Sequence, residues 1–253
     1  MRQLLPVTDM TALVDREWSL DALAEAYAYP EGDGPWLRAN MVSSLDGAGH
    51  HEGRSQPLSS ETDMRIFGTL RAIADVVVVG AETVRLEGYG PARAREAFAA
   101  RRAAAGQGPA AAIAVVSASL KLDLSLPLFT EPLVPTLVLT GAGAPAGRVA
   151  AVRAAGAEVV VAGDGAGVDP ARAVAALAER GLRRQLTEGG PRLLGQFVAA
   201  GVLDELCLTV SPTMTAGGAQ RIAGGPSVAV PTRFEPARVL EQDGFLFTRY
   251  RRI

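Results

Sequence analysis

The sequence predicts an α/β protein built on a mostly parallel sheet flanked by helices, because short apolar runs alternate with amphipathic segments along the chain. The run "DVVVVG" at 75–80 is continuously apolar and β-branched, which is typical of a strand buried on both faces. At the end of the chain, residues 237–252 alternate apolar and polar positions about a Gln-Asp-Gly turn. This last pattern predicts an antiparallel hairpin that completes the sheet.

The same signals place each element along the chain. Helices are marked by helical spacing of apolar residues and by caps, and strands by short apolar runs between breakers. The first elements are a helix at 11–29, a breaker-rich loop at 29–35, a strand at 36–42, a helix from Ser59 or Ser60 to about Ala74, and the strand at 75–80. There follow a helix at 94–106, strands at 111–117 and 136–140, a helix at 146–156, a strand at 157–163, a helix at 169–181, a strand at 183–190, a helix at 191–201 and a strand at 205–212. We divide the chain into an N-terminal helical extension over residues 1–34 and a main domain over residues 35–253.

Composition and charge exclude several classes of function. A formal net charge of −2 gives no electrostatic reason to expect nucleic acid or an anionic membrane as a partner. No apolar run reaches the ~20 residues that span a bilayer. The N-terminus lacks the apolar core of a signal peptide, so a cytoplasmic protein is expected. Cys207 is the one cysteine, which excludes an intrachain disulfide and a cysteine-rich metal site.

Ligands of such sheets bind at the carboxyl ends of the strands, so the loops there are candidate sites. The first such loop holds Ser44, Asp46 and Gly47. It is either a substrate loop that closes over a reacting centre or a turn in which Asp46 bonds its own backbone. His50 and His51 are adjacent and would point in opposite directions on a strand, so no metal site is predicted there.

A second and a third loop carry glycines at the end of a strand. Gly80 allows a ligand to approach the backbone, and the Thr83 hydroxyl either binds that ligand or caps a short helix. The loop with Gly141 and Gly143 nearly reproduces a dinucleotide-binding fingerprint, but its third glycine comes one residue late and a proline interrupts it. Thr140 and Arg148 beside that loop would suit a ribose phosphate.

The fourth loop, "TEGGP" at 187–191, combines an acid, two glycines and a proline between a strand and a helix. Pro191 fits the first helical turn without loss of a hydrogen bond. Gly189 and Gly190 lack Cβ atoms, so backbone N–H groups can face an anion at the positive end of the helix. A diphosphate fits this arrangement, and Glu188 is expected to face a hydroxyl, an amide or the substrate.

The order of these motifs is informative. They are "NMVSSLDG" at 40–47, "VVVVGAETV" at 76–84, the strand ends "VVS" at 115–117 and "LVLT" at 137–140, "TEGGPRLLGQFVAAGVLDEL" at 187–206 and "SPTMTAGG" at 211–218. Together they resemble the C-terminal reductase domain of bacterial riboflavin biosynthesis deaminase-reductases, a pyrimidine reductase family. The resemblance runs from Pro35 to Arg252 and implies a fold like that of dihydrofolate reductase. No motif of the zinc deaminase accompanies it, so only reductase activity is implied.

The resemblance implies an NADPH-dependent oxidoreductase that delivers a hydride to C1′ of an open-chain ribosylamino-pyrimidine phosphate imine. The cofactor would lie across the carboxyl ends of the strands and contact Gly80, Thr83, Val84, Ser117, Thr140, Gly189, Gly190, Pro191, Leu193 and Leu194. The small-molecule substrate would contact Asn40, Ser44, Gly47, Ser59, Arg71 and Glu87. Asp46 or Glu188 would act in catalysis by relaying a proton, and a homodimer is implied.

The sequence departs from the riboflavin enzymes at two places near the expected substrate. Asn40 stands where they commonly carry a lysine, and Glu87 and Gly88 replace the acids of an Asp-Asp-Pro motif. One alternative is therefore the same fold and cofactor with dihydrofolate or another pterin-like substrate. Another is a non-catalytic Rossmann-type nucleotide-binding module that holds its ligand at 141–143, with Asp164 on the ribose.

Overall fold

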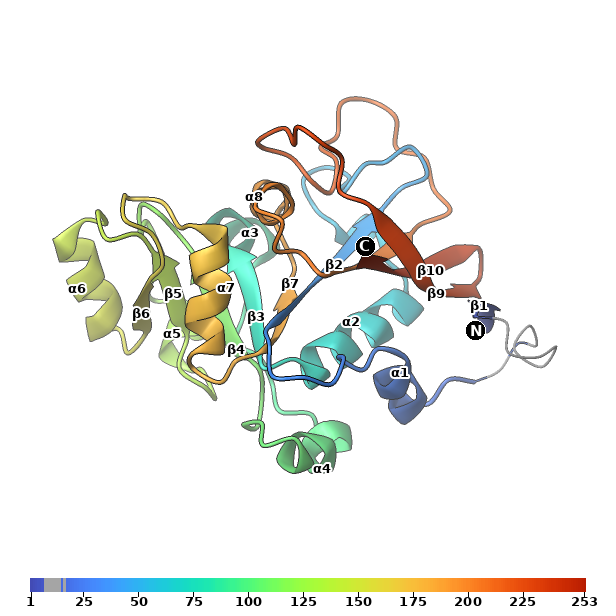
Figure 1. Cartoon of the computed structure of the whole chain (residues 1–253), viewed down its shortest axis with the longest axis horizontal. Helices are drawn as coiled ribbons and strands as arrows, with labels where there is room; N and C mark the ends of the chain where they lie inside the picture. The colour runs from blue at the N-terminus through green and yellow to red at the C-terminus, as the bar shows by residue number, and fades with distance from the viewer. Residues whose placement is uncertain (7–14, 16) are drawn as a thin grey trace.

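The computed structural model describes residues 1–6, 15 and 17–253, which form one ten-stranded sheet with helices on both faces (Figure 1). The strand order is β1-β9-β10-β8-β2-β7-β3-β4-β5-β6. The strands are β1 (Arg2–Leu5), β2 (Trp36–Ser43), β3 (Val76–Gly80), β4 (Ala112–Val116), β5 (Leu137–Thr140), β6 (Glu158–Val161), β7 (Arg184–Thr187), β8 (Glu205–Val210), β9 (Phe234–Gln242) and β10 (Phe245–Arg252). The strands from β8 to β6 pair in parallel, whereas β1, β9 and β10 pair antiparallel. The predicted fold class is confirmed.

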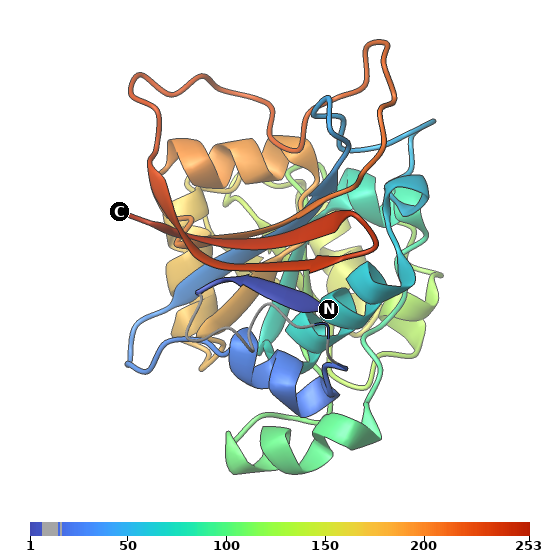
Figure 2. The same ribbon diagram turned by 90° about the vertical axis from the view of Figure 1, so that its right-hand side faces the viewer.

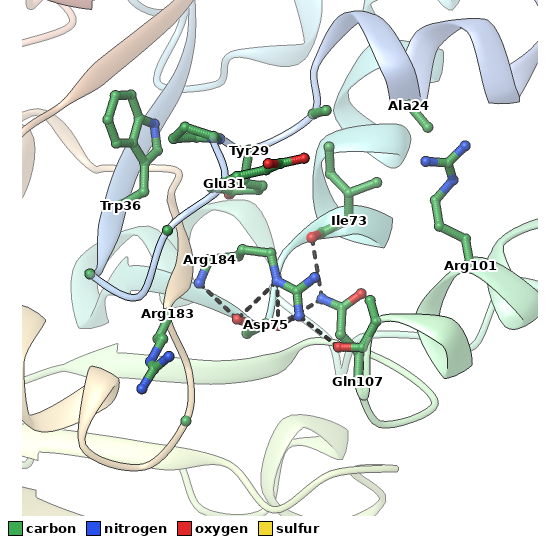
Figure 3. A pocket seen from close by; sticks show the side chains of 16 residues that line it. Ala24, Tyr29, Glu31, Trp36, Ile73, Asp75, Arg101, Gln107, Arg183 and Arg184 are labelled. Atoms are coloured by element: carbon green, nitrogen blue, oxygen red, sulfur yellow. Dashed lines mark hydrogen bonds and ion pairs between the residues drawn. The ribbon is translucent and has the colours of Figure 1, made fainter.

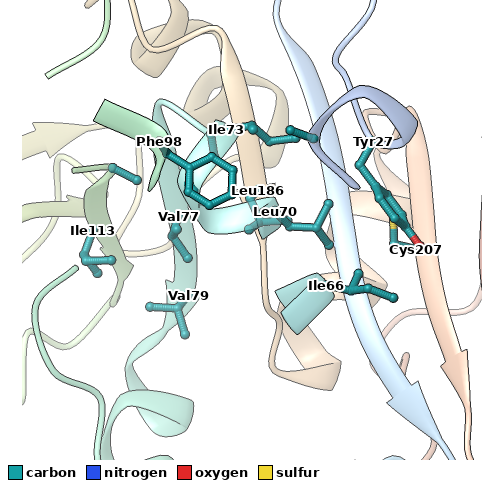
Figure 4. Packing of buried hydrophobic residues seen from close by; sticks show 14 of the residues in the cluster. Tyr27, Ile66, Leu70, Ile73, Val77, Val79, Phe98, Ile113, Leu186 and Cys207 are labelled. Carbon is teal, nitrogen blue, oxygen red and sulfur yellow. The ribbon is translucent and has the colours of Figure 1, made fainter. Parts of the chain in front are cut away.

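Two apolar cores fill the two faces of the sheet. The helices are α1 (Leu20–Ala26), α2 (Glu61–Ile73), α3 (Ala81–Glu87), α4 (Glu96–Ala104), α5 (Pro127–Thr130), α6 (Ala146–Ala154), α7 (Pro170–Ala178) and α8 (Pro191–Ala199), with a 3-10 turn η2 (Gln56–Leu58). The first core includes Leu70 of α2, Phe98 of α4 and Val77 of β3 (Figure 4). The second core includes Val78 of β3 and Phe197 of α8. Because β3 contributes side chains to both cores, its continuous apolar run is explained.

The N-terminal helix is shorter than the sequence predicts. Of the expected span at 11–29, residues 11–14 and 16 lie outside the described residues, whereas 15 and 17–19 are not helical. The helix α1 begins after Ser19, whose hydroxyl accepts a hydrogen bond from the Ala22 N–H at 3.1 Å. Serine is a preferred N-cap because its side chain satisfies an N–H group that has no intrahelical partner. The helical prediction was therefore wrong for the described residues ahead of this cap.

A buried ion network lies where α1 ends. Arg38 of β2 and Arg249 of β10 pair with Glu205 of β8 at 2.5 and 2.8 Å, and all three side chains are buried. Their other N–H groups donate to the carbonyls of Tyr27 and Ala26, at 2.7 and 2.8 Å. The last carbonyls of a helix lack intrahelical partners, so the two arginines complete this helix end. The N-terminal segment thus packs against the sheet, and its division from the rest at residue 34 stays a prediction.

The N-terminal strand β1 lies beside the C-terminal strands β9 and β10 at one edge of the sheet (Figure 2). The predicted hairpin is confirmed, with β9 and β10 joined through Asp243 and Gly244 at φ +53 and +81. The strand β1, which pairs with β9, was not predicted. No helix in the described part of the chain is long and apolar enough to cross a membrane.

Candidate active site

The carboxyl ends of β2 and β7 bring two of the predicted site residues side by side. In the register of the sheet, Ala39 of β2 and Val78 of β3 both lie beside Thr187 of β7. Asn40 and Glu188 are the next residues along these strands, so their backbones are neighbours. Asn40, inside β2, and Glu188, just after β7, therefore lie at neighbouring backbone positions near the edge where sheets of this kind bind ligands.

Arg71 of α2 holds Glu188 in a two-bond ion pair. Its Nε and Nη2 atoms donate to the two carboxylate oxygens at 2.7 and 2.6 Å. The Glu188 side chain is 6% exposed and that of Arg71 25%, so the pair keeps one accessible side. Phe67 and Tyr89 lie against the guanidinium, with ring centres 4.4 and 4.9 Å from its carbon. Burial opposes the charge of Arg71, but the Glu188 carboxylate outweighs burial and raises the pKa of the guanidinium.

The two glycines after Glu188 are explained by close backbone packing. Gly189 has φ +81, a conformation that side chains with a Cβ rarely adopt, and the peptide bond between the two glycines is cis. Its carbonyl accepts a hydrogen bond from the Gly80 N–H at 2.8 Å. A Cβ on Gly190 would lie 2.6 Å from the Thr83 hydroxyl oxygen. The predicted cofactor residues Gly80, Thr83, Gly189 and Gly190 thus form one contiguous surface.

The helix α8 starts directly at this surface. Pro191 is its first residue, and its first backbone bond runs from the Leu194 N–H to the Gly190 carbonyl at 3.0 Å. The N–H groups of Arg192 and Leu193 therefore have no partner within the helix. The side chains of Leu193 and Leu194 are buried in the second core, so only their backbone is placed to face a ligand. Val84 of α3 is likewise a buried core residue.

The predicted substrate residue Ser59 lies at the other end of α2 from Arg71. Its hydroxyl donates to Asp63 at 2.6 Å, and the Thr209 hydroxyl donates to the same carboxylate at 2.6 Å. Burial raises the pKa of Asp63 more strongly than these hydrogen bonds lower it. Twelve residues separate Ser59 from Arg71, about 18 Å along a helix. The structure does not bring these two side chains together.

In the loop after β2, the exposed carboxylate of Asp46 accepts hydrogen bonds from its own loop and from a second loop. It accepts hydrogen bonds from the Ser44 hydroxyl at 2.5 Å and from the N–H groups of Thr215 and Ala216 at 3.2 and 2.7 Å. The Ser44 hydrogen bond and those from the two backbone N–H groups lower the pKa of Asp46 to about 2. Gly47 follows at φ +88 with open space beside it. Asp46 therefore joins two loops that are far apart in the sequence.

Glu87, at the end of α3, also joins two loops. Its carboxylate accepts from the N–H and the hydroxyl of Ser55, at 3.2 and 3.1 Å. The residues on either side of Glu87 are exposed, and Tyr89 beyond them reaches the Arg71 pair. The Tyr89 hydroxyl is buried and has no hydrogen-bond partner among the described residues. The 85–91 loop is thus anchored at one position and supplies an aromatic ring to the site at another.

Ser117 and Thr140 lie together at the ends of β4 and β5. The Ser117 N–H donates to the carbonyl of Leu139, and its hydroxyl accepts from the Leu120 N–H at 3.1 Å. The Thr140 side chain is fully buried, and its hydroxyl has no partner among the described residues. The two predicted adenosine contacts are neighbours, although neither hydroxyl lies on the exposed surface.

The glycine loop after β5 is filled by the protein itself. The N–H groups of Ala142 and Gly143 donate to the carbonyls of Gly163 and Gly165, at 2.7 and 2.9 Å. A Cβ on Gly141 would collide with the carbonyl oxygen of Gly165. These glycines permit two backbone segments to touch, and the N–H groups that a Rossmann diphosphate needs are already used.

A cavity lies at the opposite, amino ends of the strands (Figure 3). It encloses about 570 Å³ and is lined by Tyr29, Trp36, Ile73, Gln107 and three arginines. Each arginine already has a carboxylate partner: Arg101 with Glu25, Arg183 with Asp33 and Arg184 with Asp75. We therefore place the candidate site at the carboxyl ends, where polar groups converge, and not in this cavity.

Comparisons with known proteins identify the family of this chain. The model of the family described as the RibD C-terminal domain matches residues 35–244. This chain belongs to that family. A 2,5-diamino-6-ribosylamino-4(3H)-pyrimidinone 5′-phosphate reductase of Archaeoglobus fulgidus is 27% identical over 220 residues, covering 86% of this chain and 99% of the relative. A reductase of the same name from Aquifex aeolicus is 31% identical over 160 residues, covering 63% and 66%.

Solved structures are also similar to this RibD C-terminal domain. The crystal structure of a pyrimidine reductase-like protein from Corynebacterium diphtheriae has a TM-score of 0.80 and 29% identity, and the match covers 91% of this chain and 98% of that one. The riboflavin biosynthesis reductase Rib7 of Saccharomyces cerevisiae has a TM-score of 0.61 at 13% identity, which shows the shared fold alone. Relatives that are named reductases support an oxidoreductase.

Sequence reasoning missed two residues of this RibD-family site. Phe67 and Tyr89 flank Arg71. Phe67 precedes Arg71 by four residues on one helix, a spacing that brings side chains together and that could have identified it. Nothing in the local sequence marks Tyr89, because it comes from a different segment of the chain.

Proposed function

We propose that the protein is an NADPH-dependent reductase of a ribosylamino-pyrimidine phosphate in riboflavin biosynthesis. The observation that carries the proposal is the Arg71–Glu188 ion pair, which stands beside Asn40 and directly before the two glycines of the α8 turn. Polar groups for a substrate and a backbone surface for a cofactor are thus contiguous. The names of the reductase relatives support the proposed substrate class.

The residues present fit the cofactor. A side chain at Gly190 would fill the surface beside Thr83, and the N–H groups of Arg192 and Leu193, which have no partner among the described residues, are available to a diphosphate. We assign the diphosphate to residues 189–194, the nicotinamide half to the segment from Gly80 to Val84, and the adenosine half to Ser117 and Thr140. When bound, NADPH supplies the hydride.

On the substrate side, the protein orients groups and controls protonation. Arg71 fixes the direction of the Glu188 carboxylate, which leaves Glu188 as our candidate for a proton relay at the reacting centre. Asn40 contributes an amide that both donates and accepts hydrogen bonds, and no hydrogen bond to it is formed by the described residues. The neutral Asn40 would recognise the sugar or amine through hydrogen bonds, where a lysine would contribute a charge.

Turnover of a substrate panel tests the proposal. Oxidation of NADPH is followed with the ribosylamino-pyrimidine phosphate, dihydrofolate and no substrate, with Glu188→Gln as the matched control. We expect turnover of the pyrimidine, confirmed by detection of the ribityl product. Turnover of dihydrofolate alone would establish the pterin alternative, and a cofactor that binds without any turnover would overturn the enzymatic assignment. The Rossmann module is disfavoured by the filled loop at 141–143.

The cytoplasmic location and the homodimer stay predictions from the sequence. Light scattering of the purified protein at several concentrations measures the oligomeric state. A mass of one chain at every concentration would contradict the homodimer.

A further inference from the structure

The irregular segment after β8 lies over both halves of the candidate site. We call residues 211–225 the strap. Its first part joins the loop after β2, since the Leu45 N–H donates to the Thr213 carbonyl and the Gly49 N–H to the Gln220 carbonyl, both at 2.8 Å. Figure 2 shows the two loops rising side by side above the sheet. The strap therefore covers the side of the site that we assign to the substrate.

The last part of the strap reaches the start of α8. The Gly224 N–H donates to the carbonyl of Pro191 at 2.9 Å. The Gly224 carbonyl lies so close to Gly195 that a Cβ on this helical glycine would collide with it. Glycine inside a helix costs about 1 kcal/mol relative to alanine, so its presence here has a packing reason. The strap thus contacts the same helix start that we assign to the cofactor diphosphate.

Among the described residues, Asp46 is the only side chain of the loop after β2 that accepts hydrogen bonds from the strap. Its two oxygens take the N–H groups of Thr215 and Ala216, and Ser44 orients it from its own loop. Ala216 has φ +54, which is uncommon for a residue with a Cβ. Such a conformation persists only where surrounding contacts hold it, and the shortest of these backbone bonds to Asp46 is made by Ala216.

We propose that Asp46 is a positioning residue that clasps the strap onto the substrate loop, and that the strap couples substrate binding to the α8 end of the site. This inference rests on the proposed function for the identity of the two ligands. It assigns Asp46 a positioning role in place of the predicted catalytic one, because its carboxylate joins Ser44 of its own loop to two backbone N–H groups of the strap.

The kinetic test compares Asp46→Ala with Asp46→Asn, and uses Asp123→Ala as the matched control. Asp123 is exposed in the loop between β4 and α5, where it accepts from the hydroxyl and N–H of Ser125, at 2.6 and 3.0 Å. Asn keeps one carbonyl oxygen and should restore part of the clasp. We expect KM for the pyrimidine to rise about tenfold in Asp46→Ala and about threefold in Asp46→Asn, with kcat and the shape of the pH profile retained. Equal losses of kcat in both variants, with one limb of the pH profile missing, would overturn the proposal in favour of a proton relay.

Amide hydrogen exchange tests the clasp without any activity. In the wild type the N–H groups of Thr215 and Ala216 should be protected, and Asp46→Ala should raise their exchange rates by about tenfold or more. Asp123→Ala should leave them unchanged. Unchanged exchange in Asp46→Ala would refute the clasp, whereas a failure of turnover with intact protection would refute only the proposed function.

Gly195→Ala tests the coupling from the other end. The change favours the helix itself but displaces the strap at Gly224. We expect KM for the pyrimidine to rise by about threefold although Gly195 lies on α8, away from the loop after β2. A change confined to the Kd of NADPH would show that the strap does not link the two sides.

Discussion

Two turns of this molecule are similar in sequence pattern but differ in what their backbone N–H groups contact. After β5 and after β7, a strand ends at the same edge of the sheet, a glycine turn follows, and a helix begins. In the turn after β5, Ala142 and Gly143 donate their N–H groups to a neighbouring loop. In the turn after β7, no described residue accepts from the N–H groups of Arg192 and Leu193 at the start of α8, and the glycines pack against Gly80 and Thr83. A glycine pattern therefore indicates that another group closely approaches the backbone. Whether that group belongs to a ligand or to the protein itself depends on the neighbouring segment of the chain.

The largest expected effect separates the two turns by cofactor affinity. Gly190→Val places a branched side chain where a Cβ alone would lie 2.6 Å from the Thr83 oxygen, so the Kd of NADPH should rise by about 100-fold, or about 2.7 kcal/mol. Gly143→Val should change the Kd by about threefold or less. Calorimetric titration measures both, with melting temperatures to confirm folding. Unchanged affinity in the Gly190 variant would remove the diphosphate from this turn.

A second variant identifies the cause of that loss. Gly190→Ala alone should crowd Thr83, and combining it with Thr83→Ala removes the oxygen that it meets. If the double variant regains thermal stability but not NADPH affinity, the added Cβ blocks the ligand directly. Recovery of both thermal stability and NADPH affinity would show that Gly190 is needed only for packing against Thr83, just as the glycines after β5 are needed for packing within the protein.

The next effect concerns Glu188, which precedes the two glycines of the turn after β7. Glu188→Gln keeps the shape of the side chain but removes the charge that Arg71 binds, a contact to charged groups of about 1.5–3 kcal/mol. We expect kcat/KM for the pyrimidine to fall by about 10- to 150-fold while the Kd of NADPH changes little. Steady-state kinetics and titration measure the two. A loss of cofactor affinity equal to the loss of kcat/KM would place Glu188 with the cofactor.

A smaller effect is expected on stability in the turn after β5. Gly141→Ala adds a Cβ that collides with the Gly165 carbonyl, and such overpacking costs about 1–3 kcal/mol. The melting temperature should fall by about 2–4 °C for each kcal/mol at this chain length. NADPH affinity, measured well below the transition, should be retained. A loss of NADPH affinity without a loss of stability would support the alternative of a Rossmann-type module that binds its ligand at 141–143.

The smallest effect is expected at Thr140, which precedes the turn after β5. Its buried hydroxyl has no partner among the described residues, so Thr140→Val removes an unsatisfied group and should leave the stability within about 0.5 kcal/mol or raise it. Urea unfolding with and without NADPH measures both properties. If the variant is equally stable alone but gains less from NADPH, the hydroxyl contacts the cofactor.

Much of the fold could be predicted because local sequence patterns indicate its helices, strands and turns. The apolar run of β3, the Ser60 cap of α2 and the turn at Asp243 are each visible within a few residues. Residues 15 and 17–19 were wrongly predicted to be helical, because Ser19 caps α1 and the helix begins at Leu20. The site was predicted residue by residue, but not its pairs: Arg71 and Glu188 are 117 positions apart, and Asp46 and Ala216 are 170 apart.

Strand and helix periodicity, caps and turn residues were thus sufficient to specify an α/β sheet with its loops at one edge. These signals depend on only a few neighbouring residues, so they can be recognised without knowledge of the tertiary structure. Which loop is open, which acid is held by an arginine and which by backbone N–H groups depend on segments that meet only after folding. The second glycine of "TEGGP" shows the difference, since its spacing was visible in the sequence but its neighbour Thr83 lies more than 100 positions earlier in the chain. Hydrogen bonds and steric contacts act over a few ångströms, and only tertiary structure brings such residues within that range.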